Sequence, residues 1–171
     1  MTYRTKTYIA ADWDHDKDAV DQLHKWNDSD HWSLNFHDAH EITQARDTSL
    51  YCSIKKSLKA RMDVSKTFIL IVGEKTNTIT KGNCMYCSSY NSYTKSCARG
   101  NSVDYRSYIE FECDKAMAAE IKVVVLYKSI NVNKSKCPDA LKYIGTHVPM
   151  LCKGVDGKTY WNYDGVKAAL E

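Results

Sequence analysis

Hydrophobic residues along the chain follow two spacings, one typical of buried strands and one typical of amphipathic helices. A short apolar run at 7–11 predicts a strand. The run at 66–72 is rich in branched residues and does not alternate, as parallel strands do when helices cover both of their faces, and 121–127 is a second candidate for such a buried strand. Apolar residues recur every three or four positions at 19–26, 50–62 and 105–119, which predicts three helices. The alternation at 32–36 predicts a further, half-buried strand.

The C-terminal part continues this order with weaker signals. We expect a short helix at 140–144 that stops at Gly145, and an edge strand at 147–151 because it contains Pro149. A terminal helix capped by Asp164 should run through Leu170. Strand and helix thus alternate about five times, which indicates crossover connections. We predict an α/β fold, a flavodoxin-like open parallel sheet of about five strands, order 2-1-3-4-5, with helices on both faces.

One long polar connection interrupts the alternation. Residues 74–104 contain several Cys and Tyr residues and have no hydrophobic period. Connections of this length are usually functional or elaborated. The length of 171 residues suits a single domain spanning 1–171, with this Cys- and Tyr-containing loop as its elaboration.

Composition and charge narrow the class of protein. The 24 Lys and Arg residues against 21 Asp and Glu leave a net charge of +3 without a basic run, so we expect no nucleic-acid partner. The longest apolar stretch, 68–72, is far too short for a membrane span, and the N-terminus lacks an apolar signal segment. The seven cysteines therefore indicate reduced thiols in a cytoplasmic protein rather than a disulfide framework.

Glu112 is the most informative residue. On the helix predicted at 105–119 it falls inside the apolar stripe, one turn after Tyr108, whereas Glu110 and Asp114 fall outside it. A carboxylate on an inward face must be paired or line a cleft, because burying it alone is costly. Two interpretations stay open, an active-site acid and a structural salt bridge. The candidate partners for such a salt bridge are Arg46, Arg61 and Arg106.

Two polar clusters follow predicted strands, at the sheet edge where open α/β folds bind ligands. The first is the acidic turn at 12–16. Acidic pairs there bind magnesium in phospho-receiver domains, but that pattern requires an Asp where this chain has Gly73. The second cluster could hold a polar ligand or be an ordinary solvated loop. It consists of His37, Asp38, His40, Glu41, Arg46 and Asp47.

Cys84 and Cys87 have the spacing that lets two thiolates reach one zinc ion, and Cys97 follows in the same loop. A structural zinc site needs four ligands, and the rest would have to come through space from Cys113, His37 or His40. We therefore expect a cysteine-containing loop without a metal, with a structural zinc as the alternative. The chain also lacks the Walker, G-x-G-x-x-G, G-x-S-x-G and H-E-x-x-H motifs.

Several stretches resemble the TIR-like family that includes the Thoeris antiphage protein ThsB. They are KTYIAAD (6–12), NFHDAH (35–40), ARDTS (45–49), IKKSL (54–58), SKTFILIVGE (65–74) and YIEFECDKA (108–116). The resemblance runs from about residue 5 to 150. In this family the third helix carries a pattern like Trp-Val-x-x-Glu-Ile-x-x-Ala, whose Glu is the catalytic acid. Its alignment places Tyr108 at the Trp and Glu112 at the Glu.

The resemblance implies an enzyme that cleaves the nicotinamide–ribose bond of NAD+, an NAD+ glycohydrolase or ADP-ribosyl cyclase. The product would be a cyclic ADP-ribose-type or related second messenger, made in antiphage defence and activating a separate effector. NAD+ is then a substrate, no cofactor or metal is implied, and a homo-oligomer is plausible. Glu112 would be catalytic. The expected substrate-binding residues are Asp12, Asp38, Arg46, Asp47 and Tyr108. The alternative is a non-enzymatic TIR-like interaction or scaffold module.

Overall fold

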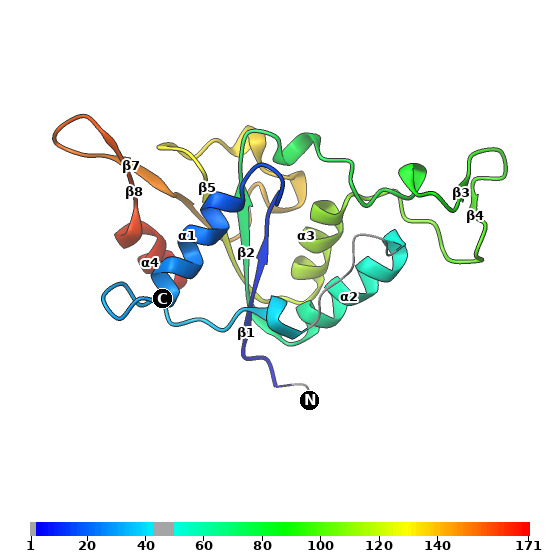
Figure 1. Cartoon of the computed structure of the whole chain (residues 1–171), viewed down its shortest axis with the longest axis horizontal. Coiled ribbons are helices and arrows are strands. Elements are labelled where there is room, and N and C mark those ends of the chain that lie inside the picture. The colour runs from blue at the N-terminus through cyan, green and yellow to red at the C-terminus, as the bar shows by residue number, and fades with distance from the viewer. Residues whose placement is uncertain (1–2, 43–49) are drawn as a thin grey trace.

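A four-stranded parallel sheet forms the centre of the computed structural model, which describes residues 3–42 and 50–171 (Figure 1). The strand order is β1-β2-β5-β6, and every neighbouring pair is parallel. The bounds are β1 Lys6–Ala10, β2 Ser65–Val72, β5 Lys122–Tyr127 and β6 Thr146–Pro149. This arrangement confirms the predicted flavodoxin-like α/β class, with four central strands in place of about five.

Helices cover both faces of the sheet. They are α1 Lys17–Asn27, α2 Tyr51–Asp63, α3 Tyr108–Ala118 and α4 Tyr163–Leu170. Phe68 of β2 packs with Met62 of α2 and Cys113 of α3 on one face. The next residue, Ile69, packs with Leu23 of α1 and Val166 of α4 on the other. Because both faces are buried, the central strands are continuously hydrophobic.

The predicted strand at 32–36 is not formed. The side chain of Asn27 at the end of α1 takes both backbone groups of Phe36, accepting from its N–H (2.8 Å) and donating to its carbonyl (3.0 Å). The N–H of Phe36 is therefore not available for a ladder with β1, and its carbonyl is already engaged. Only one isolated bridge, between Thr7 and Asp38, lies next to β1 on this side of the described sheet. The segment occupies the place of a second strand without becoming one.

The C-terminal part also differs from the prediction in detail. A 3-10 turn, Asp139–Leu141, stands where the helix at 140–144 was expected, and β6 is the edge strand predicted around Pro149. Asn162, not Asp164, caps α4, because its Oδ1 accepts from the N–H of Gly165 at 3.1 Å. A small hairpin precedes α4. Its strands are β7 Leu151–Lys153 and β8 Thr159–Trp161.

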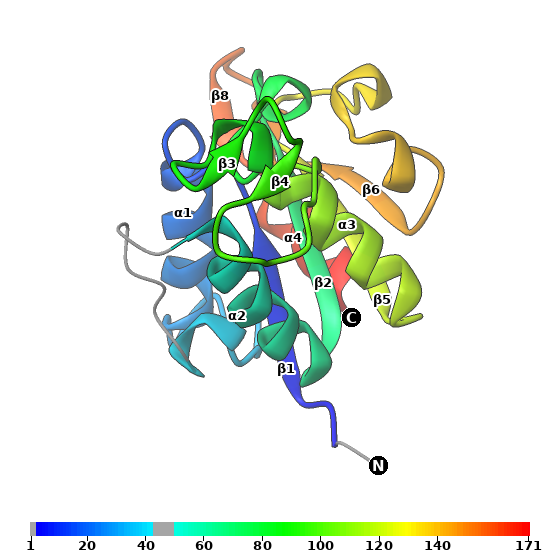
Figure 2. The ribbon, with the colours of Figure 1, turned by 90° about the vertical axis from the view of Figure 1, so that its right-hand side faces the viewer.

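The connection between β2 and α3 projects from the body of the protein at the right of Figure 1, and Figure 2 views it end-on. It has little regular structure. It contains two 3-10 turns, Thr76–Thr78 and Cys84–Tyr86, and a hairpin of β3 Tyr90–Asn91 and β4 Ser96–Cys97. No helix within residues 3–42 and 50–171 has the length and apolarity needed to cross a membrane.

Candidate functional site

A pocket of about 500 Å³ opens beside the carboxyl ends of β1 and β2. The turn after β1 contributes Asp12 and Trp13, and the 3-10 turn Ala39–Ile42 contributes His40. Tyr108 and Glu112 of α3 form the facing wall. Open α/β sheets bind their ligands at this edge. The fold therefore brings three of the predicted site residues, Asp12, Tyr108 and Glu112, into one pocket.

Glu112 lies at the inner end of this pocket and is 7% exposed. Its Oε1 accepts a hydrogen bond of 2.5 Å from the hydroxyl of Tyr8 on β1. Burial raises the pKa of Glu112 to about 7, although the Tyr8 hydrogen bond and the charge of Arg61 both lower it. The carboxyl group thus titrates near neutral pH, in the range that acid–base and charge-stabilising groups of active sites use.

The arginines considered as salt-bridge partners for Glu112 have different positions. Arg106 pairs instead with Asp104 at 2.9 Å and with Asp114 at 2.7 Å. Arg61 lines the same pocket as Glu112 and acts on its carboxylate through its charge. Arg46 lies outside the described residues. The carboxylate of Glu112 is therefore bonded to the hydroxyl of Tyr8 and influenced by the charge of Arg61, and it lines the pocket.

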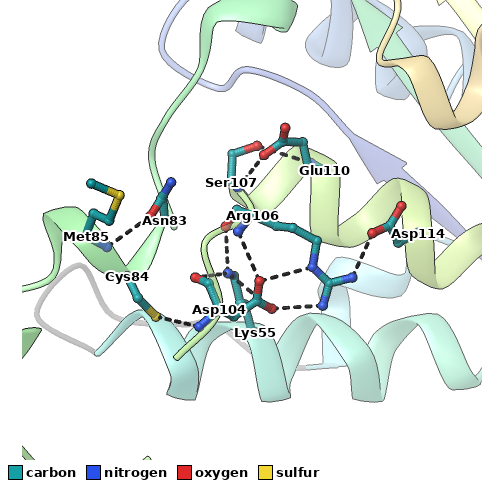
Figure 3. A network of polar contacts seen from close by, with 9 residues as sticks. All are labelled: Lys55, Asn83, Cys84, Met85, Asp104, Arg106, Ser107, Glu110 and Asp114. Carbon is teal, nitrogen blue, oxygen red and sulfur yellow. Dashed lines mark hydrogen bonds and ion pairs between the residues drawn. The ribbon is translucent and has the colours of Figure 1, made fainter. Parts of the chain in front are cut away.

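The start of α3 is fixed by a polar network (Figure 3). Ser107 and Glu110 form a capping box, in which Ser107 Oγ accepts from the Glu110 N–H and Glu110 Oε2 accepts from the Ser107 N–H. Lys55 of α2 donates to the carbonyl of Arg106 at 2.6 Å. The guanidinium of Arg106 helps to lower the pKa of Asp104 to about 2, against burial. The network sets the helix position, and so the position of Glu112 one turn later.

A histidine and aromatic wall faces α3. The ring of His40 lies 5.3 Å from that of Tyr8 and 5.5 Å from that of Trp13. Asp38 lies behind His40, accepting from its Nδ1 (2.9 Å) and pairing with His24 Nε2 (3.1 Å). Burial opposes ionisation of Asp38, but these histidine hydrogen bonds hold its pKa well below the ordinary value. Asp38 therefore positions His40 instead of lining the pocket itself.

The remaining predicted residues have these positions. The Asp12 carboxylate contacts His15 Nδ1 at 2.6 Å. The Tyr108 hydroxyl is buried without a hydrogen-bond partner in the described structure, and burial raises its pKa above the ordinary value. Asp47, like Arg46, lies outside the described residues. The sequence analysis did not identify Lys81, which lines the pocket, or Tyr8, which bonds to Glu112. The signal for Tyr8 was the alternation of side chains along β1, because Ile9 faces one helical layer and Tyr8 faces the other, formed by α2 and α3.

Within residues 3–42 and 50–171 no group of three or more His, Cys, Asp or Glu side chains is placed so that it could hold a metal ion. Cys113, one of the residues considered for a zinc site with the loop cysteines, is buried in the core between α3 and the sheet. His40 is engaged with Asp38. Cys52 of α2, which the sequence did not suggest, lines a small cavity together with Cys84, Cys87 and Cys97.

The sheet, its two helical layers and the pocket at the strand ends define a TIR-like α/β protein. More particularly, residues 8–81 match the family model of the TIR-like domain of the Thoeris protein ThsB, which confirms the family resemblance. These residues make up less than half of the chain, and over them it is similar to the ThsB TIR-like family. The match ends before α3, so Tyr108 and Glu112 lie beyond it. No curated protein matches the chain.

Proposed function

We propose that the chain cleaves NAD+ and converts the ADP-ribose part into a cyclic or related second messenger for Thoeris antiphage defence. One observation carries the proposal. The carboxylate of Glu112, on the inward face of α3, reaches a pocket of about 500 Å³ at the ligand-binding edge of the sheet. The match of residues 8–81 to the TIR-like domain of the Thoeris protein ThsB supports the role in defence.

Cleavage breaks the bond between the ribose carbon and the nicotinamide nitrogen. The electron pair goes to that nitrogen and neutralises its positive charge, while the ribose carbon becomes oxocarbenium-like. A carboxylate at Glu112 stabilises this developing positive charge and accepts hydrogen bonds from the ribose hydroxyls. Water then adds to give ADP-ribose and a proton, or a nucleophile of the same molecule adds to give a cyclic product and a proton.

The pocket walls supply groups suited to the rest of NAD+. Trp13 is 44% exposed, and its ring meets that of His40, so a planar base can stack at this point. Lys81 lines the pocket and lies 3.8 Å from the exposed carboxylate of Asp14. This weak surface pair leaves the ammonium group of Lys81 able to meet a phosphate. The resulting messenger would act on a separate effector.

The experiment compares the wild type with Glu112→Gln in phage-infected cells, followed by nucleotide profiling by mass spectrometry. Infected cells are used because the activity is expected to need a phage signal. Glu110→Gln is the matched control, because it lies on the same helix and glutamine keeps the capping box. We expect an ADP-ribose-derived nucleotide in the wild type and the control, but not in Glu112→Gln. Undiminished product from a folded Glu112→Gln protein would refute the mechanism.

A non-enzymatic interaction module is the second candidate. The observation in its favour is the tip of the β2–α3 connection, where Tyr86 and Tyr93 are 61% and 95% exposed. Exposed aromatic side chains commonly mark contact surfaces. Under this alternative, nucleotide profiles of wild type and Glu112→Gln would match, and Tyr86→Ser with Tyr93→Ser would abolish self-association or partner binding.

A further inference from the structure

Four cysteines from three separate stretches line one small cavity. Cys52 lies in the first turn of α2, Cys84 and Cys87 begin and follow a 3-10 turn, and Cys97 ends β4. The cavity has a volume of about 10 Å³. Because a cavity of this size holds only about one water-sized particle, its occupant would be a single ion and not an organic molecule.

The cysteines also form the inner side of the segment 84–104. Cys84 is the one buried residue of this segment, while Met85, Tyr86 and Tyr93 are exposed. Its hairpin has only two residues in each strand, and such a hairpin is marginal by itself. Small units without a hydrophobic core are usually held by disulfides or a metal ion. The cysteines of the chain are free thiols, so no disulfide holds this segment.

Hydrogen-bond donors lie beside the sulfur atoms of Cys52, Cys84 and Cys97. The backbone N–H of Asp104 donates to Cys84 Sγ at 3.3 Å, as Figure 3 shows, and the Asn101 amide donates to Cys52 Sγ at 3.3 Å. Backbone N–H groups of Arg99 and Asn101 donate to the sulfur of Cys97. Hydrogen bonds of this kind favour the thiolate, which is the form that binds metals, and they orient it.

We propose that Cys52, Cys84, Cys87 and Cys97 bind one structural zinc ion. Four thiolates make a closed tetrahedral site, and the C-x-x-C pair supplies two of them from one turn. Soft thiolate ligands select zinc over the hard cations magnesium and calcium. As the side chains are placed in the described residues, no three of them could hold a metal ion. The proposed binding therefore requires the four thiol groups to turn towards the cavity that they line.

The proposed ion ties the β2–α3 connection to α2 and so supports one wall of the pocket. The connection carries Lys81, whose carbonyl accepts from the Tyr108 N–H at 2.8 Å. It also carries Gly82, whose φ of 99° and close approach to the Tyr108 ring leave no room for a side chain. The zinc proposal does not depend on the proposed function, because it concerns only how the β2–α3 connection is fixed to α2.

The test is metal analysis of the full-length chain, purified under reducing conditions without chelators. We expect about one zinc per chain, as in structural sites generally. After removal of the zinc, added Co²⁺ should give the visible bands and thiolate charge-transfer absorption of a tetrahedral four-sulfur site. This measurement uses the wild type, so it does not depend on whether any variant folds.

Variants then assign the ligands. Cys52→Ser, Cys84→Ser, Cys87→Ser and Cys97→Ser should each lose at least about tenfold in zinc affinity. Cys152→Ser is the matched control and should keep its zinc, since Cys152 lies on β7. The proposal is wrong if the reduced wild type neither contains zinc nor takes up Zn²⁺ or Co²⁺. It is equally wrong if Cys52→Ser binds zinc as tightly as the wild type, or if these cysteines prove to be paired as disulfides.

Discussion

The hydroxyl of Tyr8 donates a 2.5 Å hydrogen bond to Oε1 of Glu112, joining the first strand of the sheet to α3 at the inner end of the pocket. The two residues are 104 positions apart in the chain. The bond favours the ionised form of Glu112, whereas burial disfavours it, and the balance leaves its pKa at about 7. Four predictions follow from this relationship and from its surroundings.

Removing the Tyr8 hydroxyl should raise the pKa of Glu112 further. In Tyr8→Phe the carboxylate loses its donor, and a hydrogen bond to a charged group contributes about 1.5–3 kcal/mol. If the carboxylate is the active form, the acidic limb of the pH profile of NAD+ cleavage moves up by about one to two pH units. Tyr143→Phe, at a tyrosine that is 80% exposed, is the control and should leave the profile in place. If the acidic limb of the pH profile stays in place in Tyr8→Phe, the hydrogen bond from Tyr8 does not set the pKa of Glu112.

Glu112→Gln should make the protein more stable, and the gain should depend on pH. The folded state raises the pKa of Glu112 from 4.5 to about 7, so it binds a proton more tightly than the unfolded state does. Stability contributed by Glu112 therefore falls as the pH rises between these values, and the loss corresponds to roughly 3 kcal/mol. Urea unfolding at pH 8 and near pH 4.5 should show a gain for Glu112→Gln that is large at the higher pH and small at the lower. Equal differences at both pH values would contradict the raised pKa.

Asp38→Asn should loosen the wall opposite α3. The substitution removes the carboxylate that holds His24 and His40, and breaking such a buried charged network costs about 1–3 kcal/mol at neutral pH. Because the pKa of Asp38 is lowered in the folded state, this stabilisation is present above pH 3.8 and is lost as the pH falls through the folded value. The raised pKa of His24 should return towards 6.5 in an NMR titration. The exposed Asp30→Asn is the control, and an unchanged His24 titration in Asp38→Asn would contradict the assignment.

Trp13→Ala should weaken substrate binding more than catalysis. The ring of Trp13 lies at the pocket wall beside the ring of His40, where a base of the substrate can stack, so its loss should raise KM for NAD+ about tenfold with a smaller change in kcat. Trp32→Ala is the matched control, because Trp32 is similarly exposed at 42% and packs on Tyr163, outside the pocket. A fall in kcat with unchanged KM would mean that Trp13 acts on the reacting bond and not on binding.

Local patterns in the sequence determined the fold class and the position of the candidate acid, Glu112. Continuous apolar runs predicted the central strands because both sheet faces are buried, and helical periodicity placed Glu112 on the inward face of α3. The strand predicted at 32–36 was wrong. Hydrophobic and polar residues do alternate there, but the side chain of Asn27 forms hydrogen bonds with the backbone N–H and carbonyl of Phe36. The sequence analysis also missed Ser107 as the start of α3 and predicted a helix from 105.

Only the tertiary structure decided which distant residues meet. Tyr8 reaches Glu112 because β1 and α3 contribute to the same core cluster, and His40 reaches the pocket because Asp38 holds its ring. Cys52 approaches the loop cysteines because the cysteine-containing connection packs against the start of α2. The physical reason is that periodicity records which side of an element is buried, whereas the partner across the interface depends on how whole elements pack. The sequence by itself therefore determined the class and one candidate acid, and packing decided its donor, its pKa and the pocket around it.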